Sequence, residues 1–555
     1  MNRNGESGGL LNLIVRLLVT VVSGGIYFYV MLPPINLKSM EFWLFLFVLL
    51  AIYLIVTLVT SGLRITRNGN FVLPQGMFFS RCKIPLFLMA VLLIAGIIAG
   101  IYSSVIFHAN SYYNLLDVQT GDFTEEVAEI SYDKIPMLDK DSSVQLGSRA
   151  LGNLSSDSSL VSQFEVSDEE YSQINYQNNP VRVAPLLYGN LIKWFNNRSE
   201  GLPGYIIVNM VTQEADLVQL DEGMKYSTGE HFGRNLYRLL RFRYPTMMFG
   251  DVNFEIDEDG TPWWVCSRTV HKIGLFGGED TDGAVLVNAI TGESAYYEEV
   301  PTWVDRVYSA DQLVQQYDYH GTLVNGWINS WLGQKGITTT SDGYNYIAMN
   351  DDVYLYTGVT SAGNDESNVG FILVNQRTKE ARYYNITGAT EYSAMSSAEG
   401  AVQHLGYAAT FPILLNISDE PTYFMSLKDS ADLVKMYAMV NVSDYQITAT
   451  GSSVAECQAN YEELLVENGI KVTDPVELVE TETDTVTGTV TEIRSVVVDG
   501  NTVFYFSLGT DTYYAVSAAD DQNAVIYDVG DKVTITYYVE DTGDDSGVLT
   551  GIRVE

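Results

Sequence analysis

The sequence predicts an α+β protein with three N-terminal transmembrane helices, tandem antiparallel hairpin–helix–hairpin units and a small C-terminal β-barrel. Three observations lead to this prediction. Long apolar runs fill the first 108 of the 555 residues, and one short phrase recurs three times between residues 201 and 469. Residues 485–555 alternate apolar and polar positions between turn residues, as strands of a small barrel do.

The recurring phrase is a Val-Asn pair followed five residues later by Glu, at 208–214, 287–293 and 374–380. Each copy follows an apolar, β-branched run that predicts a strand, and Asn at the strand's end starts a turn. The copies stand about 80 residues apart, which is typical of tandem structural units. Gly292 suits a left-handed turn position, so Gln213 and Lys379, which replace it in the other copies, are expected to carry modest strain.

Acidic residues dominate the composition, with 69 Asp and Glu against 31 Lys and Arg and a net charge of −38. This charge argues against binding to nucleic acid or to an anionic membrane surface. The 37 tyrosines and the 18% of charged residues favour strand-rich folded domains over disorder. Three cysteines without a close pair exclude a disulfide scaffold and a zinc site built from cysteine.

Residues 1–108 are predicted to form a membrane domain. Apolar runs at 10–32, 42–60 and 84–107 are each long enough to cross a hydrocarbon core of about 30 Å. The first run is too long for a cleavable signal peptide, and two more spans follow it. The lipid bilayer is therefore the first partner that the sequence predicts.

Basic residues in the short loops predict the orientation of these spans. The first loop carries only Lys38, whereas the second loop carries Arg64, Arg67, Arg81 and Lys83. This bias places the N-terminus and the basic loop in the cytoplasm. With three spans, the large remainder of the chain is then extracytoplasmic.

Residues 109–469 are predicted to hold the repeated units. Residues 109–200 form a partial leading unit, in which 116–121 weakly echoes the phrase, and residues 201–469 hold three units. Each copy of the phrase is followed by a helical stretch and a second hairpin, so each helix is expected to lie on an antiparallel sheet. The predicted helices are 144–154, 234–243, 309–317 and 396–407, with 453–468 as a terminating helix.

An acidic linker at 470–484 is predicted to separate these units from a C-terminal domain at 485–555. Five strands are expected in this domain, beginning with one long strand at 485–498 and interrupted by an irregular stretch at 518–525. This pattern resembles a small barrel of the OB-fold type. OB-folds often bind nucleic acid, but that use is not expected because the domain's only basic residues are Arg494, Lys532 and Arg553.

The second copy of the phrase, Val287-Asn288-Ala289-Ile290-Thr291-Gly292-Glu293, resembles the core phrase of PepSY-type domains, in which Asp usually stands in place of Asn288. Those domains occur in propeptides of secreted proteases and in membrane-anchored bacterial envelope proteins, and they are thought to inhibit or modulate peptidases. The resemblance implies a similar role for the repeated units. The whole chain also resembles a group of bacterial membrane proteins, mostly from Gram-positive anaerobes, that have no assigned activity.

The sequence contains no evident catalytic constellation. No two histidines stand at metal-ligand spacing on one element; they are His108, His231, His271, His320 and His404. There is no H-E-x-x-H motif, phosphate-binding P-loop or dinucleotide fingerprint, so no cofactor is expected. A nucleophile assembled in space, such as a serine with His404, stays open.

Clusters of carboxylates are the nearest approach to a metal site. One acidic turn contains Asp257 and Asp259, a second contains Asp280 and Asp282, and a third spans 541–545. Their oxygens are the hard ligands that Ca²⁺ prefers, although no cluster has the twelve-residue EF-hand spacing. The alternative is that each cluster is a solvated turn without a metal.

Cys266 and Cys457 both lie outside the membrane in the predicted topology. They could form a disulfide in an oxidising exterior, or they could be small apolar core residues. Core packing is expected to explain most of the clustered aromatic residues, and an exposed group of them would mark a contact surface for protein or glycan; the tryptophans concerned are Trp263, Trp264, Trp303, Trp327 and Trp331.

These patterns predict a plasma-membrane protein whose extracytoplasmic scaffold acts by binding other envelope or membrane proteins. It would modulate an envelope protease, serve as a chaperone or belong to a membrane complex. The alternative is a cell-envelope hydrolase, acting on peptides or glycans, with a site assembled in the repeated units. Two or more of the histidines within hydrogen-bonding reach of Ser, Asp or Glu in one cleft would favour the enzyme.

Overall fold

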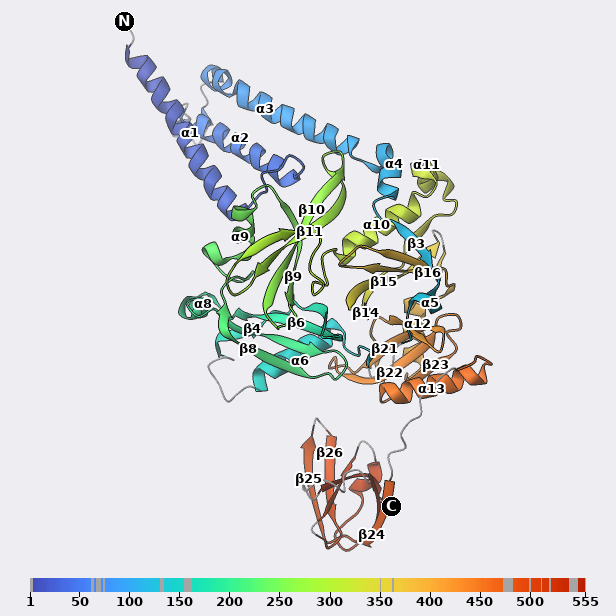
Figure 1. Ribbon diagram of the computed structural model, residues 1–555. Helices are drawn as coiled ribbons and strands as arrows, with labels where there is room; N and C mark the ends of the chain where they lie inside the picture. The colour runs from blue at the N-terminus through green and yellow to red at the C-terminus, as the bar shows by residue number, and fades with distance from the viewer. Residues whose placement is uncertain are drawn as a thin grey trace. The chain divides into compact units, whose positions relative to one another are not determined.

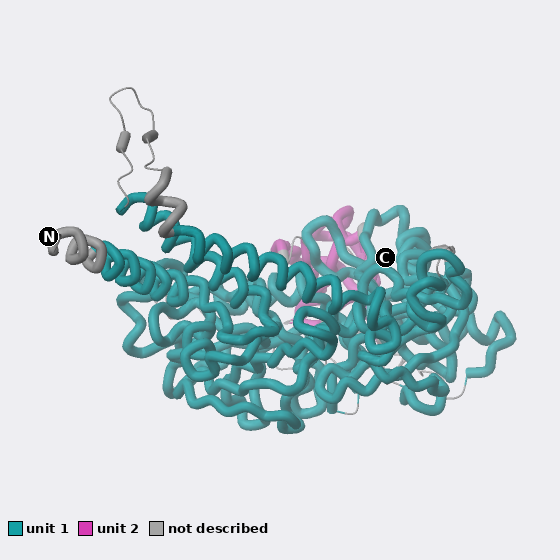
Figure 2. Tube along the Cα trace, turned by 90° about the horizontal axis from the view of Figure 1, so that it is seen from above, with its two compact units in different colours: residues 1–475 teal, residues 476–555 magenta. Residues whose placement is uncertain are grey.

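The structure is a computed structural model with two compact units, residues 1–475 and residues 476–555, which Figure 2 colours separately. The predicted linker at 470–484 lies mostly outside the described residues, and Arg67 and the acidic cluster at 541–545 lie wholly outside them. The described residues are 3–60, 64–65, 71–72, 75–129, 134–153, 162–349, 351–361, 364–472, 483–498, 501–510, 512–518, 521–538 and 548–554.

Three long helices begin unit 1 and lie together apart from its sheets (Figure 1): α1 (Arg3–Met31), α2 (Met40–Thr60) and α3 (Gln75–Tyr102). Each is long and apolar enough to cross a membrane, over Asn12–Met31, Met40–Thr60 and Cys82–Tyr102. This confirms the prediction of three N-terminal apolar helices. Between α2 and α3, two short strands pair with each other, β1 (Arg64–Ile65) and β2 (Phe71–Val72).

The third predicted span, 84–107, is too long at its C-terminal end. The helix stops at Tyr102, and Ser104 has an extended backbone and is the N-cap of the next helix, α4 (Val105–Tyr113). Serine is a weak helix former; Ser104 makes no side-chain capping bond, whereas the hydroxyl of Ser103 accepts the backbone N–H groups of Leu275 and Phe276 just after the helix ends.

The folded body of unit 1 contacts the three helices at one end. The backbone N–H of Ile35, in the loop between α1 and α2, donates to the carbonyl of Pro245 at 2.7 Å. At the end of α3, the Ser103 hydroxyl accepts the backbone N–H groups of Leu275 and Phe276. The loop after α1 and the C-terminal end of α3 therefore lie on the same side, against the body.

Four sheets make up this body, and all their strand pairs are antiparallel except one pair at the edge of sheet 3, described below. Sheet 1 contains β4 (Phe164–Val166), β5 (Ser172–Tyr176), β6 (Asn179–Tyr188), β7 (Leu202–Asn209) and β8 (Ala215–Met224). Sheet 2 contains β9 (Met248–Ile256), β10 (Pro262–Ile273), β11 (Gly277–Asn288) and β12 (Ser294–Tyr297). Sheet 3 contains β13 (Thr338–Thr340), β14 (Asn345–Met349), β15 (Asp352–Ser361), β16 (Asn364–Asn375), β17 (Ala381–Tyr384) and β18 (Gly388–Ala389). Sheet 4 contains β19 (Ala408–Ala409), β20 (Ile413–Ile417), β21 (Glu420–Lys428), β22 (Val434–Asn441) and β23 (Thr448–Gly451).

The three Val-Asn segments end strands β7, β11 and β16, and their turns make the same hydrogen bonds. In each turn the Asn side-chain oxygen accepts the backbone N–H groups two and three residues on, at 2.8 to 3.0 Å. The Asn N–H donates to the carbonyl of the Glu five residues on. The left-handed position has φ of 61° at Gln213, 73° at Gly292 and 67° at Lys379.

A fourth turn in sheet 4 has a similar design. Asn441, the last residue of β22, accepts the backbone N–H groups of Ser443 and Asp444, each at 2.9 Å. Its own N–H donates to the carbonyl of Ile447, six residues on, so this turn is one residue longer than the others. Because of that insertion and the absence of Glu, the sequence phrase does not reveal it.

Helices precede the sheets in the chain order and pack on them. They are α6 (Lys140–Asn153), η2 (Phe232–Arg234) with α9 (Leu236–Arg243), α10 (Ala310–Thr322) and α12 (Glu391–Ala401), with α13 (Val454–Glu467) after sheet 4. Thr390 caps α12, so the predicted helix 396–407 is displaced toward its C-terminus by about a turn and a half. Shorter helices are α5 (Phe123–Glu126), α8 (Leu191–Asn197), α11 (Gly326–Ile328) and η3 (Asn329–Gly333).

The hydrophobic core is shared between neighbouring sheets. Apolar residues of α9 pack between sheets 1 and 2, and those of α12 pack between sheets 3 and 4. The buried face of α13, with Cys457, Tyr461 and Leu465, covers the other face of sheet 4. The α+β class is thus confirmed.

Side-chain hydrogen bonds join the sheets in a closed order. Tyr205 of sheet 1 bonds Gly260 of sheet 2, and Asn345 of sheet 3 bonds Phe411 at the start of sheet 4. The two residues with a left-handed backbone make the remaining links between sheets. Lys379, in the turn of sheet 3, bonds Asp280 of sheet 2, and Gln213, in the turn of sheet 1, bonds Tyr437 of sheet 4 at 2.6 Å. In Figure 1 the sheets follow one another around unit 1 from teal through green and olive to orange.

Residues 109–200 do not form a separate sheet. The segment that echoes the phrase becomes β3 (Val118–Gly121), which pairs in parallel with β17 at the edge of sheet 3. The remaining strands in this range belong to sheet 1, which continues through β8. The boundary expected at residue 200 therefore passes through sheet 1.

The described residues of unit 2 form a six-stranded sheet in the order β24-β28-β29-β27-β26-β25, in which β27 and β29 are the one parallel pair. The single strand expected at 485–498 is divided into β24 and β25 by Val490 and Thr491, whose N–H groups bond outside the ladder. The strands are β24 (Thr483–Thr489), β25 (Glu492–Val498), β26 (Asn501–Ser507), β27 (Tyr513–Ser517), β28 (Lys532–Tyr538) and β29 (Val548–Val554), with η4 (Gln522–Val525) before β28.

Candidate functional site

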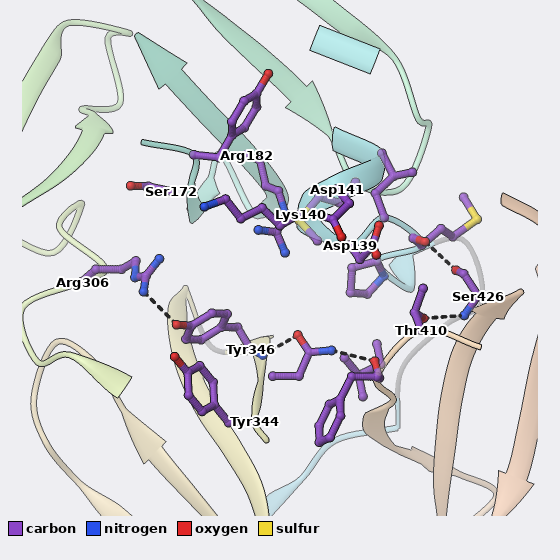
Figure 3. Close-up of a pocket in the computed structure, with 18 of the residues that line it drawn as sticks. Asp139, Lys140, Asp141, Ser172, Arg182, Arg306, Tyr344, Tyr346, Thr410 and Ser426 are labelled. Carbon is purple, nitrogen blue, oxygen red and sulfur yellow. Dashed lines mark hydrogen bonds between the residues drawn. The ribbon is translucent and has the colours of Figure 1, made fainter. Parts of the chain in front are cut away.

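A cavity of about 520 Å³ opens where the four sheets of unit 1 meet (Figure 3). Every sheet contributes to its wall, and so does the segment 136–141 that leads into α6. The polar residues of the wall are Asp139, Lys140, Asp141, Glu169, Glu170, Tyr171, Ser172, Arg182, Asn253, Arg306, Tyr344, Asn345, Tyr346, Thr410 and Ser426.

Arg182 is the most deeply buried charge in this wall, with 6% of its surface exposed. It lies in β6, where one guanidinium nitrogen donates to Gln173 at 3.0 Å, while Nε has no hydrogen-bond partner in the described structure. Burial lowers the pKa of Arg182 to about 10, and the nearby Arg306 acts in the same direction. A buried guanidinium with an unused N–H is suited to receive an anionic or carbonyl oxygen.

Arg306 faces the same space from the segment before α10. Its guanidinium donates to the Tyr346 hydroxyl at 2.9 Å and lies over the Tyr346 ring, 4.6 Å from its centre. This contact holds a planar cation in place by both a hydrogen bond and a cation–π interaction. Figure 3 shows Arg182 and Lys140 extending into the space that Arg306 and Tyr346 border.

Segment 136–141 is fixed by hydrogen bonds to the start of α6 and by contacts with sheet 4. Asp139 accepts the backbone N–H of Ser142 at the start of α6 and forms an ion pair with Lys428 of sheet 4 at 2.7 Å. Burial alone would raise the pKa of Asp139, but the hydrogen bonds from Lys428 and Ser142 outweigh it and lower the pKa. The Ser426 hydroxyl also donates to the carbonyl of Met137 at 2.6 Å.

A pair of buried carboxylates lies behind Arg306. Glu255 accepts the backbone N–H groups of Asp305 and Arg306 at 2.9 and 3.1 Å, and Asp305 accepts that of Asn175 at 2.7 Å. Burial raises the pKa of Glu255 to about 7, and burial beside Glu255 raises the pKa of Asp305. These groups fix the backbone that carries Arg306, so they position the wall.

The cavity combines fixed cations with hydroxyl and amide groups. Arg182 and Arg306 offer planar donor pairs, which match a carboxylate or phosphate group. Four carboxylates stand at the same wall, so the site favours a ligand that carries both signs of charge; they are Asp139, Asp141, Glu169 and Glu170. This arrangement can bind a polar peptide segment.

None of the five histidines lines this cavity. His231 packs edge-on against Trp194, and His320 stacks on Tyr113 with ring centres 4.3 Å apart. His271 lies on β10, where its carbonyl accepts Lys38, and His404 is exposed after α12. The serine–His404 arrangement that the sequence leaves open therefore has no place in this cavity.

The carboxylates predicted as calcium candidates have other partners in the structure. Asp280 forms ion pairs with Lys379 and Lys272, and Asp282 forms one with Arg268 at 3.4 Å. Asp257 accepts two backbone N–H groups of its own turn, including that of Asp259. Within the described part of the chain, no three His, Cys, Asp or Glu side chains gather as a metal site requires. Calcium binding at these turns stays a prediction.

Cys266 and Cys457 are free and fully buried in separate cores. Of the two alternatives, the structure supports the second: both cysteines are apolar core residues, and they do not form a disulfide with each other. Burial raises the pKa of both thiols.

Among the aromatic residues, Trp264 is fully buried, and Trp263 packs on Trp303. An exposed group does remain at α11 and η3, where Trp331 and Ile328 are 69% and 67% exposed.

Arg182 and Arg306 are the functional candidates that sequence patterns miss, because neither belongs to a motif. A signal for Arg182 does exist in the sequence. It stands inside the apolar strand run Val181-Arg182-Val183-Ala184, and an arginine buried in a strand must be paired or face a polar cavity. Arg306 has no comparable signal, because its place depends on how sheets 2 and 3 meet.

Comparisons with known proteins identify no family. No family model matches the chain, and no curated protein matches it. Among solved structures, the chain is similar to a levansucrase variant of B. megaterium, with 10% identity, a TM-score of 0.17 and coverage of 78% of this chain and 94% of that one. It is similar to Bacillus subtilis levansucrase with 8% identity, a TM-score of 0.16 and coverage of 77% and 97%. No family is assigned to the chain by these similarities.

Proposed function

We propose that this protein is a plasma-membrane scaffold that acts outside the cytoplasm by binding other envelope or membrane proteins. The observation that carries the proposal is the cavity to which all four sheets of unit 1 contribute charged and hydroxyl side chains. A partner would insert a polar segment there, with a carboxylate placed between Arg182 and Arg306. Such a scaffold would modulate an envelope protease, serve as a chaperone or hold a membrane complex together.

The proposed orientation has a cytoplasmic N-terminus and an extracytoplasmic body. Two contacts with the body support it. The loop after α1, with Lys38 as its only basic residue, contacts the body, and so does the C-terminal end of α3. Basic residues gather at the opposite end of the helices, between α2 and α3. An excess of Lys and Arg is typical of cytoplasmic loops.

The four sheets are interpreted as tandem copies of one PepSY-like module. Four Asn-initiated turns at the same strand junction support this interpretation, as does the helix that precedes each sheet. For unit 2, the parallel pairing of β27 with β29 and the division of the first strand support an OB-like barrel.

Photo-crosslinking in native membranes tests the proposed binding. A photoreactive amino acid replaces Tyr344, which is 36% exposed at the cavity, and a matched control replaces Tyr445, which is 51% exposed outside the cavity wall. The expected result is a discrete covalent partner from position 344 that is absent from position 445. The same set of products from both positions would contradict binding at the cavity.

Removing the guanidinium adds specificity to this experiment. Arg182→Met keeps an unbranched apolar stem of nearly the length of the arginine methylenes and removes the guanidinium with its charge and N–H donors. The crosslink from position 344 is expected to fall, while the yield and unfolding temperature of the protein are checked in parallel. A folded Arg182→Met variant with an unchanged crosslink would contradict the role of Arg182.

A further inference from the structure

One face of unit 1 is both basic and apolar. It is built from α8, η2 and the outer side of α9, and we define it by six exposed large side chains. They are Leu191, Ile192, Phe195, Phe232, Tyr237 and Phe242, which are 48% to 73% exposed. Apolar groups this exposed on contiguous elements mark an interaction surface.

The local charge of this face is opposite to that of the whole chain. Residues 231–247 contain four arginines, of which Arg241 is only 7% exposed, and no Asp or Glu, in a chain with a net charge of −38. Lys193 and Arg198 add two cations from α8 and its C-cap. Four acids stand near the face: Glu230 is 1% exposed and bound to Trp194 and Tyr188, Glu200 follows the C-cap, and Glu170 and Asp251 lie near Tyr237.

The parts of the face are held together by direct contacts. Arg234 of η2 donates to the carbonyl of Arg198, which joins η2 to the end of α8. The rings of Trp194 and Phe232 lie 6.1 Å apart, and the Arg198 guanidinium lies 4.5 Å from the centre of the Phe195 ring. The cations are therefore interleaved with aromatic rings on a fixed surface.

This face is continuous with the last turn of the first apolar helix. The Arg238 guanidinium lies over the ring of Tyr29, 4.8 Å from its centre, and Arg241 donates to the carbonyl of Leu32 at 2.7 Å. Phe242 packs edge-on against Phe28. Since Phe28 and Tyr29 belong to the span Asn12–Met31, α9 lies at the depth where that span leaves the hydrocarbon.

We propose that this face binds anionic lipid headgroups. These headgroups belong to the leaflet next to the folded body, where the C-terminal end of α1 leaves the hydrocarbon. Arginine forks bind headgroup phosphates, and exposed Phe, Ile and Leu side chains enter the interfacial layer, as they do in interfacial amphipathic helices. The contact would fix the orientation of the body on the bilayer. The inference rests on the membrane anchoring proposed above, and it departs from the expectation based on net charge, which averages over the whole chain.

The lipid surface is the occupant that the geometry favours. A protein partner would have to share the space beside the last turn of α1 with the lipids that surround this helix. Charge complementarity also points to lipid, because each Lys or Arg near an anionic membrane surface strengthens binding roughly fivefold.

Collisional quenching in vesicles tests the inference with the full-length chain. A fluorescent label is placed on Phe195→Cys, with Val466→Cys on α13 as the matched control, because Phe195 is 61% exposed and Val466 59%. Both variants are reconstituted into vesicles of phosphatidylcholine with phosphatidylglycerol, in which some lipids carry a nitroxide near the headgroup. The label at position 195 is expected to be quenched at least about twofold more than the label at 466.

Equal quenching at the two positions in a correctly inserted chain would overturn the inference and leave the face to a protein partner. Failure of the chain to insert at all would instead overturn the membrane anchoring. A second variant, Lys193→Glu with Arg198→Glu, is expected to reduce the quenching at position 195 in vesicles that contain phosphatidylglycerol. Unchanged quenching in this variant would contradict recognition of anionic headgroups.

Discussion

The ion pair between Lys379 and Asp280 is predicted to stabilise the junction of sheets 2 and 3. The Lys379 ammonium lies 2.5 Å from Asp280 and 2.8 Å from the carbonyl of Leu115. The side chains of Lys379 and Asp280 are 14% and 11% exposed. Burial lowers the pKa of Lys379, while Asp280 opposes that shift, so the charged form depends on its partner.

The magnitude follows from what each substitution removes. Lys379→Met leaves Asp280 with the half-exposed Lys272 at 3.7 Å and a hydrogen bond from Gln316, so the loss is expected to be about 2 to 3 kcal/mol. Lys379→Gly also relieves the positive φ of 67°, which returns about 0.5 to 1 kcal/mol. We therefore expect the Gly variant to be less stable than the wild type but more stable than the Met variant.

The assay is urea unfolding of the detergent-solubilised full chain, followed by tryptophan fluorescence. All seven tryptophans lie in unit 1, so the signal reports that unit alone. A double-mutant cycle with Asp280→Asn is expected to give a coupling energy of about 1 to 3 kcal/mol.

The matched control pair is Lys435 with Asp429, which are 3.8 Å apart and 39% and 25% exposed. Its coupling energy is expected to stay below about 0.5 kcal/mol, because solvent screens an exposed pair. If the Lys379–Asp280 coupling were no larger than this control, or if Lys379→Gly were more stable than the wild type, the reasoning would be refuted.

Three further predictions concern unit 1. Asn375→Ala should lower the free energy of unfolding by about 1 kcal/mol more than Asn288→Ala does. The reason is that the side-chain amide of Asn375 also donates to the buried carboxylate of Asp352. Equal losses in the two variants would contradict this. The raised pKa of Glu255 means that its folded form favours the bound proton, so stability should fall as pH rises from about 4.5 to about 7. The fall should be smaller in Glu255→Gln, because Asp305, whose pKa is raised by burial, then titrates without its partner; an unchanged pH profile in that variant would contradict the assignment. Cys266 and Cys457 should react with maleimide only after unfolding. A disulfide between them would instead leave both unlabelled and make the mass of the intact protein two hydrogen atoms lower than the mass of the reduced chain.

The features that the sequence predicts are those with a local cause. Three apolar runs of sufficient length produce three helices, because length and hydropathy alone decide that outcome. Two predicted helices begin at Ser309 and Ser453, and in the structure these two residues cap α10 and α13 through their hydroxyl groups. The turns after Asn209, Asn288 and Asn375 follow from one side chain that accepts two backbone donors.

The features that the sequence does not reveal depend on how distant segments meet. The strain expected at Gln213 and Lys379 is present as positive φ, but the contacts of these side chains with other sheets have no sequence signal. The turn after Asn441 escapes the repeated phrase because of one inserted residue. Likewise, Arg306 becomes a cavity residue only when sheet 3 places Tyr346 beside it.

Labelling of two cysteine variants in intact cells tests the central claim most directly. Glu298→Cys places a thiol on the exposed surface of the body, and Arg67→Cys places one in the basic segment between α2 and α3. Cys82→Ser removes the native thiol at the start of the third span. A membrane-impermeant maleimide is expected to label position 298 in intact cells and position 67 only after permeabilisation. Labelling of position 67 in intact cells, with position 298 protected, would contradict an extracytoplasmic scaffold.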